Sequence, residues 1–139
     1  MKRFVAGLTA GMLMFGGVAW ASDYVGDLCW SFSNPTQGTS GTIRLGISHI
    51  GGGHYLTSGV ASVTTPIVVQ VPVHGNVEII GGEIVSTLTA PGSRNGVIGN
   101  DMQKIKLNSS TLNGSFESIG VYSDAVEISN GTLTHTPCP

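Results

Sequence analysis

Charged residues are scarce in this sequence, and their scarcity narrows the range of expected partners. Only 10% of the 139 residues are charged, with six lysines and arginines against eight aspartates and glutamates. The chain has no basic patch and no run of basic residues interleaved with aromatics. Neither nucleic acid nor an anionic membrane surface is therefore an expected partner.

Sequence motifs of catalysis are also missing. There is no G-x-S-x-G nucleophile elbow, and the glycine runs at 51–53 and 81–82 are not followed by the Lys-Ser/Thr pair of a phosphate loop. The four histidines have no cysteine or carboxylate beside them at metal-ligand spacing. We therefore predict no catalytic residue, no metal site and no cofactor. An isomerase or cyclase acting in a barrel pocket is an alternative that rests on the histidines alone.

The chain has only two cysteines, Cys29 and Cys138, which allow a single intramolecular pairing. They stand near the two ends of the part of the chain that follows residue 21. In a meander of antiparallel strands, a bond between them would join the first strand to the last, which suits a sheet closed into a barrel. In the chain-entropy model, closing a loop of about 110 residues stabilises a fold by roughly 4–5 kcal/mol.

The first 21 residues have the features of a secretory signal. Lys2 and Arg3 precede an uncharged apolar stretch at 4–18, and residues 19–21 form an A-x-A cleavage triplet. We expect export to the periplasm, the cell surface or the extracellular space, where disulfides persist, and no stable membrane insertion after cleavage. An uncleaved anchor is the alternative. Residues 22–139 would then be one domain, with four basic against eight acidic residues and a net charge of −4.

Residues 22–139 show no convincing helical period. Gly, Thr, Ser, Val and Ile dominate, and turn signals recur every 8–12 residues, which is typical of an all-β sandwich or barrel. We expect a loop at 90–101, a turn or a kink at 74–76, a turn at 130–131, and either a strand or a loop at 124–128. The predicted strands are 27–33, 42–50, 54–61, 67–73 continuing at 77–80, 83–89, 102–107, 112–120 and 132–138. The sequence thus predicts an antiparallel up-and-down barrel of about eight strands, its first and last strands joined by the disulfide.

Alternation along the predicted strands assigns large apolar side chains and His49 to the barrel interior or its rim, and His135 on the last strand is a further candidate for the rim. Barrels of eight strands are either filled by such side chains or hold one small ligand, and both interpretations stay open here. The candidates for a ligand pocket are Trp30, Phe32, Leu45, Ile47, His49, Tyr55, Phe116 and His135.

The first predicted strand resembles that of the calycins, the group of small lipocalin- and avidin-like barrels. Gly26 and Trp30 stand in the segment G-D-L-C-W, where lipocalins have G-x-W, so this chain has two extra residues between them. No C-terminal helix is visible, and Trp30 is the only tryptophan after residue 21, so avidin's ligand-contacting tryptophans have no counterparts. The resemblance implies a barrel that binds a small, largely apolar molecule. The alternative function is a structural or assembly protein of the cell surface or extracellular matrix, with self-association.

Overall fold

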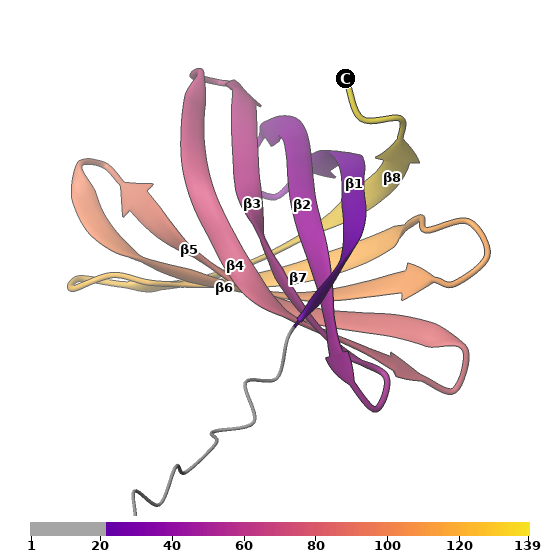
Figure 1. Cartoon of the computed structure of the whole chain (residues 1–139). Coiled ribbons are helices and arrows are strands. Elements are labelled where there is room, and N and C mark those ends of the chain that lie inside the picture. The colour runs from indigo at the N-terminus through magenta and orange to yellow at the C-terminus, as the bar shows by residue number, and fades with distance from the viewer. Residues whose placement is uncertain (1–21) are drawn as a thin grey trace, which may run out of the picture.

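Alternating inward apolar and outward polar residues produce eight long strands in the computed structural model, which describes residues 22–139 (Figure 1). The predicted signal segment, 1–21, lies outside the described residues. The strands are β1 (Asp23–Asn34), β2 (Thr39–Gly51), β3 (His54–Thr65), β4 (Val69–Ile80), β5 (Glu83–Arg94), β6 (Val97–Asn108), β7 (Gly114–Val121) and β8 (Val126–Thr136).

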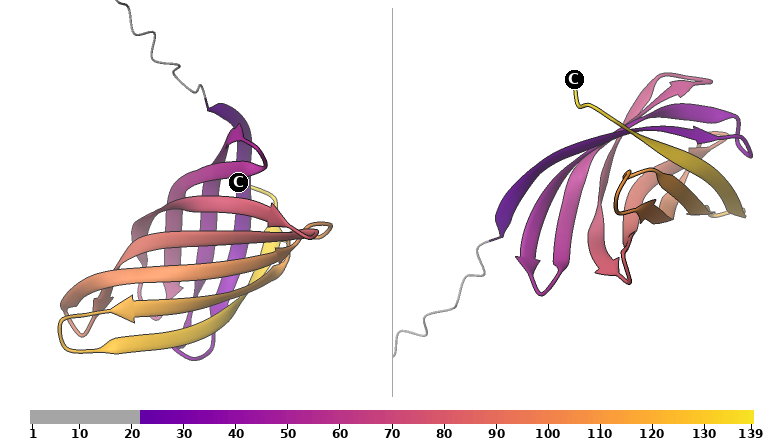
Figure 2. Two further views of the ribbon diagram at one scale, coloured as in Figure 1. Left: turned by 90° about the horizontal axis from the view of Figure 1, so that it is seen from below. Right: turned by 90° about the vertical axis from the view of Figure 1, so that its right-hand side faces the viewer.

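Each strand pairs antiparallel with the next, and β8 returns to pair with β1, so the predicted closed eight-stranded barrel is confirmed. The sheet is strongly twisted. Figure 2 shows β4–β8, coloured pink to yellow, lying across the indigo and magenta strands β1–β3. Within residues 22–139 no helix is long and apolar enough to cross a bilayer.

The disulfide between Cys29 and Cys138 is present, with 5.2 Å between the two Cα atoms. Cys29 lies in β1, opposite Thr136, which is the last residue of β8. Cys138 follows the end of β8, so the bond ties β1 to the short tail beyond that strand. A disulfide persists in oxidising compartments, and the bond therefore agrees with an exported protein.

Three expected interruptions of the sheet are wrong. The expected loop at 90–101 is the end of β5 and the start of β6, which pair up to the turn at 95–96. Residues 74–76, expected to form a turn or a kink, do not turn the chain but lie within β4, where Gly75 pairs with Thr57 and Leu88. The expected turn at 130–131 lies within β8, which begins at Val126 and thereby makes most of 124–128 a strand.

Close approach of neighbours explains the glycine in β8. A Cβ on Gly131 would lie 2.4 Å from the Cζ atom of Phe116 and 2.4 Å from the carbonyl oxygen of Ser33. The ring of Phe116 therefore occupies the space that a side chain at position 131 would need. Glycine here allows an aromatic ring to pack inside the barrel and does not end the strand.

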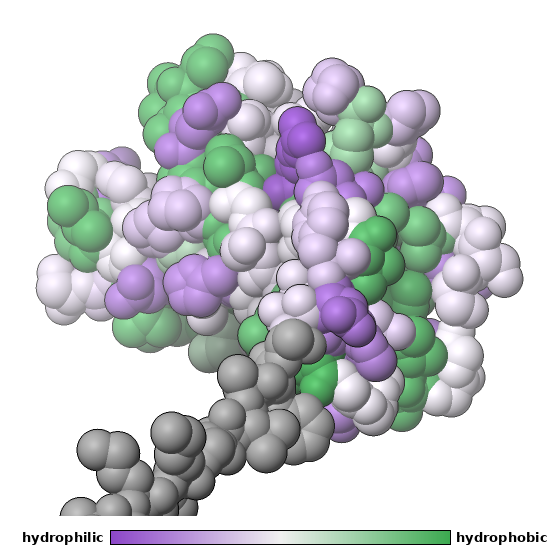
Figure 3. Space-filling view, in the orientation of Figure 1, coloured by the Kyte–Doolittle hydropathy of each residue, from purple (hydrophilic) through white to green (hydrophobic). Residues whose placement is uncertain are grey.

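The interior has three zones along the barrel. A cavity lies in the half where β1 begins, a packed apolar layer fills the middle, and hydrogen-bonded polar side chains occupy the other end. Phe32 and Phe116 meet edge to face in the packed layer, with 6.4 Å between ring centroids. Several apolar side chains lie instead on the outer surface, and Figure 3 shows such residues separated by polar ones on one face.

Candidate functional site

The candidate site is a cavity of about 130 Å³ inside the barrel. Its wall comes from seven of the eight strands and from the turn between β6 and β7, and eleven of its fourteen side chains are aliphatic hydrocarbons. The lining residues are Leu28, Trp30, Ile43, Leu45, Ile47, Tyr55, Val77, Ile79, Ile84, Ser86, Ile105, Leu107, Leu112 and Leu133.

Two of the polar side chains in this wall are already hydrogen-bonded to backbone carbonyls. The indole Nε1 of Trp30 donates to the carbonyl oxygen of Leu112 at 2.8 Å, and the hydroxyl of Ser86 donates to that of Asn76 at 2.9 Å. A buried polar group that has its partner gains nothing from a ligand. Along these parts of the wall the cavity therefore presents hydrocarbon only.

Leu112 reaches the cavity from a turn that is held in a fixed shape. The side-chain oxygen of Asn108 accepts hydrogen bonds from the backbone N–H groups of Ser110 and Thr111, at 2.9 and 3.0 Å. Leu112 itself has a φ of 58°, a left-handed backbone conformation that residues other than glycine rarely adopt. The bond from Trp30 to its carbonyl draws this turn toward the barrel, and the leucine side chain thus becomes part of the wall.

The rim of the cavity has a different chemistry. Tyr55 lines the cavity at the start of β3, and its ring lies 5.0 Å, centroid to centroid, from the ring of His49 on β2. Ile79 on β4 is part of the same wall and is 54% exposed, so the cavity reaches solvent beside it. Within residues 22–139, neither the hydroxyl of Tyr55 nor the imidazole of His49 hydrogen-bonds to another protein group.

The structure divides the predicted pocket residues into three groups. Trp30, Leu45, Ile47 and Tyr55 line the cavity, and His49 lies beside Tyr55 at the rim. Phe32 and Phe116 lie deeper and fill the barrel. The imidazole of His135 packs edge-on against Trp30 with 6.0 Å between centroids, outside the cavity wall.

Sequence reasoning missed most of the wall. Leu28 is in phase with Trp30 and Ile43 is in phase with Leu45, so strand alternation also assigns both to the interior. Ile84 and Leu107 lie in predicted strands, but no sequence signal says which end of a strand borders a void. Leu112 is in phase with Phe116 in the predicted strand 112–120, but it lies before β7, and its place in the wall depends on a turn that folds inward.

The other end of the barrel is closed by polar side chains. The Nδ2 atom of Asn34 donates to the hydroxyl of Ser129 at 2.9 Å, and both residues are buried. Arg94, the last residue of β5, bonds to Glu127 on β8 and, at 3.1 Å, to Asp124 in the turn between β7 and β8. These contacts and the packed aromatic layer separate the cavity from this end of the barrel. Solvent therefore reaches the cavity from the opposite end, beside Ile79.

Asp101 is the acidic residue set deepest in this polar end. A Cβ at Gly92 or Gly120 would lie 2.7 or 2.6 Å from an oxygen of its carboxyl group, so both glycines make room for it. Burial raises the pKa of Asp101, although a hydrogen bond of 3.2 Å from the hydroxyl of Tyr122 acts in the opposite direction. Burial and this carboxylate together raise the pKa of Tyr122 to about 12.

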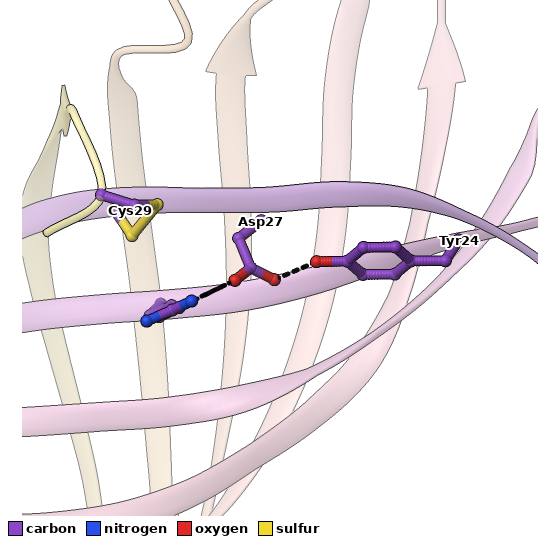
Figure 4. Close-up of a disulfide and its surroundings, with 5 residues drawn as sticks. Tyr24, Asp27 and Cys29 are labelled. Atoms are coloured by element: carbon purple, nitrogen blue, oxygen red, sulfur yellow. Dashed lines mark hydrogen bonds and ion pairs between the residues drawn. A yellow bond between two sulfur atoms is a disulfide. The ribbon is translucent and has the colours of Figure 1, made fainter.

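A second polar cluster lies on the outer wall near the disulfide (Figure 4). The carboxylate of Asp27 accepts hydrogen bonds from the hydroxyl of Tyr24 at 2.5 Å and from Nε of Arg44 at 2.9 Å. The bond from Tyr24, followed by that from Arg44, lowers the pKa of Asp27. Asp27 and Arg44 border a groove over Gly46, but the carboxylate of Asp27 is already bonded to both Tyr24 and Arg44, so the three side chains form a surface network.

The remaining histidines are dispersed. His54 lies 3.4 Å from a carboxylate oxygen of Glu78, and His74 lies 3.0 Å from the hydroxyl of Thr89 on the outer wall. Within residues 22–139, no three histidine, cysteine, aspartate or glutamate side chains are grouped so that they could hold a metal ion.

Comparison with protein-family models, curated proteins and solved structures found no match to this chain. An eight-stranded antiparallel barrel is compatible with the architecture of the calycins. Trp30 on β1 lines the cavity of this barrel.

Proposed function

We propose that the protein is an exported barrel that binds a small, largely apolar molecule in the cavity between β1 and the β6–β7 turn. The observation that carries this proposal is an apolar wall in which Trp30 and Ser86 have their hydrogen-bonding groups bound to the protein's own backbone. Such a surface is poorly hydrated, and an apolar molecule gains about 25 cal/mol for each Å² that it removes from water.

The zones of the interior support the same function. The edge-to-face pair of Phe32 and Phe116 and the polar end beyond it form a floor, while the rim near Ile79 reaches solvent. A preformed apolar pocket with one entrance is the usual form of a small-molecule site. The disulfide supports a role in the periplasm or outside the cell, because disulfides form and persist in these oxidising compartments.

The test compares two phenylalanine substitutions at neighbouring positions of β5. Ile84→Phe adds volume to the cavity wall, whereas Val85→Phe adds it to the opposite face of the same strand. Benzene is titrated into each protein, and binding is followed by NMR shifts of the leucine and isoleucine methyl groups. We expect benzene to bind the unchanged protein and Val85→Phe, and to bind Ile84→Phe at least tenfold more weakly. Equal affinity for both variants, or no binding to the unchanged protein, contradicts the proposal.

A second candidate, assembly with copies of the same chain, is favoured by an apolar row on the outer wall. Met102, Ile119 and Ile128 are register partners on β6, β7 and β8, and Met102 and Ile128 are 50% and 63% exposed. Because the patch is uncharged, the same patch on two copies of the chain can pack together in a symmetric dimer without charge repulsion. Light scattering after size-exclusion chromatography tests this function. Self-association is expected to be lost in Ile128→Lys and kept in Thr134→Lys, and a monomer at all concentrations excludes it.

A further inference from the structure

We infer that the ligand is a neutral amphiphile with a hydrocarbon body of about one six-membered ring and a single hydroxyl-type group held at the rim by Tyr55 and His49. A simple phenol has this chemistry. The inference rests on the proposed function, because it concerns the same cavity, and it specifies what the cavity prefers.

The size of the body follows from the volume. The cavity measures about 130 Å³, and an apolar protein cavity of about 150 Å³ stays dry and takes up benzene. One ring therefore fills most of the available space. A second fused ring would have to displace packed side chains such as Ile105 and Leu107, which are both buried, and overpacking a core costs about 1–3 kcal/mol.

The neutrality of the ligand follows from the wall. No charged side chain lines the cavity, and the polar atoms of Trp30 and Ser86 are already bonded to backbone carbonyls. A charged group placed there would lose its water and find no partner, which costs several kcal/mol. An ionised ligand is therefore disfavoured unless its charge remains outside.

The position of the polar group follows from the atoms that remain free. Tyr55 is the one lining residue, within the described part of the chain, whose polar atom makes no hydrogen bond to the protein. His49 lies against its ring and is likewise unbonded. A phenolic hydroxyl and an imidazole can each donate or accept, so a ligand group that does both, such as a hydroxyl, matches this rim.

The experiment uses toluene and p-cresol, which differ by one hydroxyl group, with affinities measured by NMR titration of the cavity methyl groups. Without a partner at the rim, p-cresol would bind more weakly than toluene, because its hydroxyl would lose water. We expect p-cresol to bind at least as tightly as toluene. Tyr55→Phe is expected to weaken p-cresol binding about 3- to 10-fold, the effect of one hydrogen bond, and to leave toluene unchanged.

Tyr122→Phe is the matched control, since it removes a tyrosine hydroxyl from the other end of the barrel. It is expected to leave both affinities unchanged. His49→Ala is expected to weaken p-cresol binding more than toluene binding. 1-Naphthol, which adds a fused ring, is expected to bind at least tenfold more weakly than p-cresol.

The outcomes separate this inference from the proposed function. If toluene binds but p-cresol binds more weakly and Tyr55→Phe has no effect, the hydroxyl site is wrong and the apolar pocket stands. If 1-naphthol binds as tightly as p-cresol, the size limit is wrong. If no probe shifts the cavity methyl groups, both the pocket and this inference are overturned.

Discussion

The indole of Trp30 on β1 is hydrogen-bonded to the backbone carbonyl of Leu112, 82 residues further along the chain, at 2.8 Å. This bond joins the first strand to the turn between β6 and β7, across the mouth of the barrel. It satisfies the only polar side-chain atom of a buried tryptophan and holds a leucine in a left-handed conformation at the cavity wall.

Replacing Trp30 with phenylalanine is expected to loosen this turn. The variant loses one hydrogen bond and some buried volume, and we expect the free energy of unfolding to fall by about 2 kcal/mol. Hydrogen exchange at the amide of Leu112 should become faster. Phe32→Leu is the control, because it removes a partly buried ring that makes no hydrogen bond; it should lower stability without changing that exchange rate. An unchanged rate in the Trp30 variant contradicts this role.

Thr57 and Ser86 are buried hydroxyl residues with opposite expected responses to deletion. The Oγ1 atom of Thr57 is the one buried side-chain polar atom without a hydrogen-bond partner in residues 22–139. Thr57→Val is therefore expected to raise the free energy of unfolding by up to about 1 kcal/mol, whereas Ser86→Ala, which loses a bond to Asn76, should lower it by about 1 kcal/mol. Urea denaturation measures both. A loss of stability in Thr57→Val would show that the hydroxyl has a partner, such as a bound water.

Two aspartates are expected to make opposite contributions to the pH dependence of stability. The pKa of Asp101 is raised by burial, so its contribution is complete below its ordinary pKa of 3.8 and is lost as the pH rises through the higher folded value. The pKa of Asp27 is lowered by Tyr24 and Arg44, so its contribution is present above 3.8 and is lost as the pH falls through the lower folded value.

The measurement is the stability of Asp101→Asn and Asp27→Asn relative to the unchanged protein between pH 2 and pH 7, a range that spans the ordinary aspartate pKa of 3.8. The Asp101 variant should gain relative stability as the pH rises, and the Asp27 variant should gain it as the pH falls. Parallel curves for the two variants would show that the environments of these carboxylates have been assigned wrongly.

Removing the disulfide is expected to lower the free energy of unfolding substantially. The bond closes a loop with a sequence separation of 109 residues, which corresponds to about 4–5 kcal/mol in the chain-entropy model. Urea denaturation with and without a reductant measures the loss. A double variant, Cys29→Ala with Cys138→Ala, should show the same lowered stability and no response to the reductant. An unchanged midpoint on reduction would mean that the bond contributes little.

The architecture was accessible from the sequence because it depends on local signals. Alternation placed Trp30 and Ile47 inside, and the two cysteines at the ends of the meander indicated closure. The predicted interruptions of strands were wrong where a glycine makes room for a neighbouring side chain instead of ending the strand. Gly92 makes room for the carboxyl of Asp101, and Gly131 makes room for the ring of Phe116, and neither neighbour can be known from the glycine itself.

The cavity was less accessible for a physical reason. Whether an inward side chain borders a void depends on how the side chains of several strands meet at one level of the barrel. Phe32 and Trp30 are two residues apart on the same face, yet Trp30 lines the cavity and Phe32 packs against Phe116 below it. That difference is set by the stagger of the strands and by the inward turn at Leu112.

The ladder that closes the barrel is also its shortest. β1 and β8 share five residue pairs, from Cys29 with Thr136 to Ser33 with Thr132, and the first residues of β1 extend past the end of β8. The disulfide joins the two strands at the Cys29 end of this ladder, where their separation would begin. If the disulfide were reduced and β1 separated from β8, both strands would expose unpaired N–H and C=O groups, which are templates for pairing with other chains. The bond thus guards against aggregation as well as unfolding.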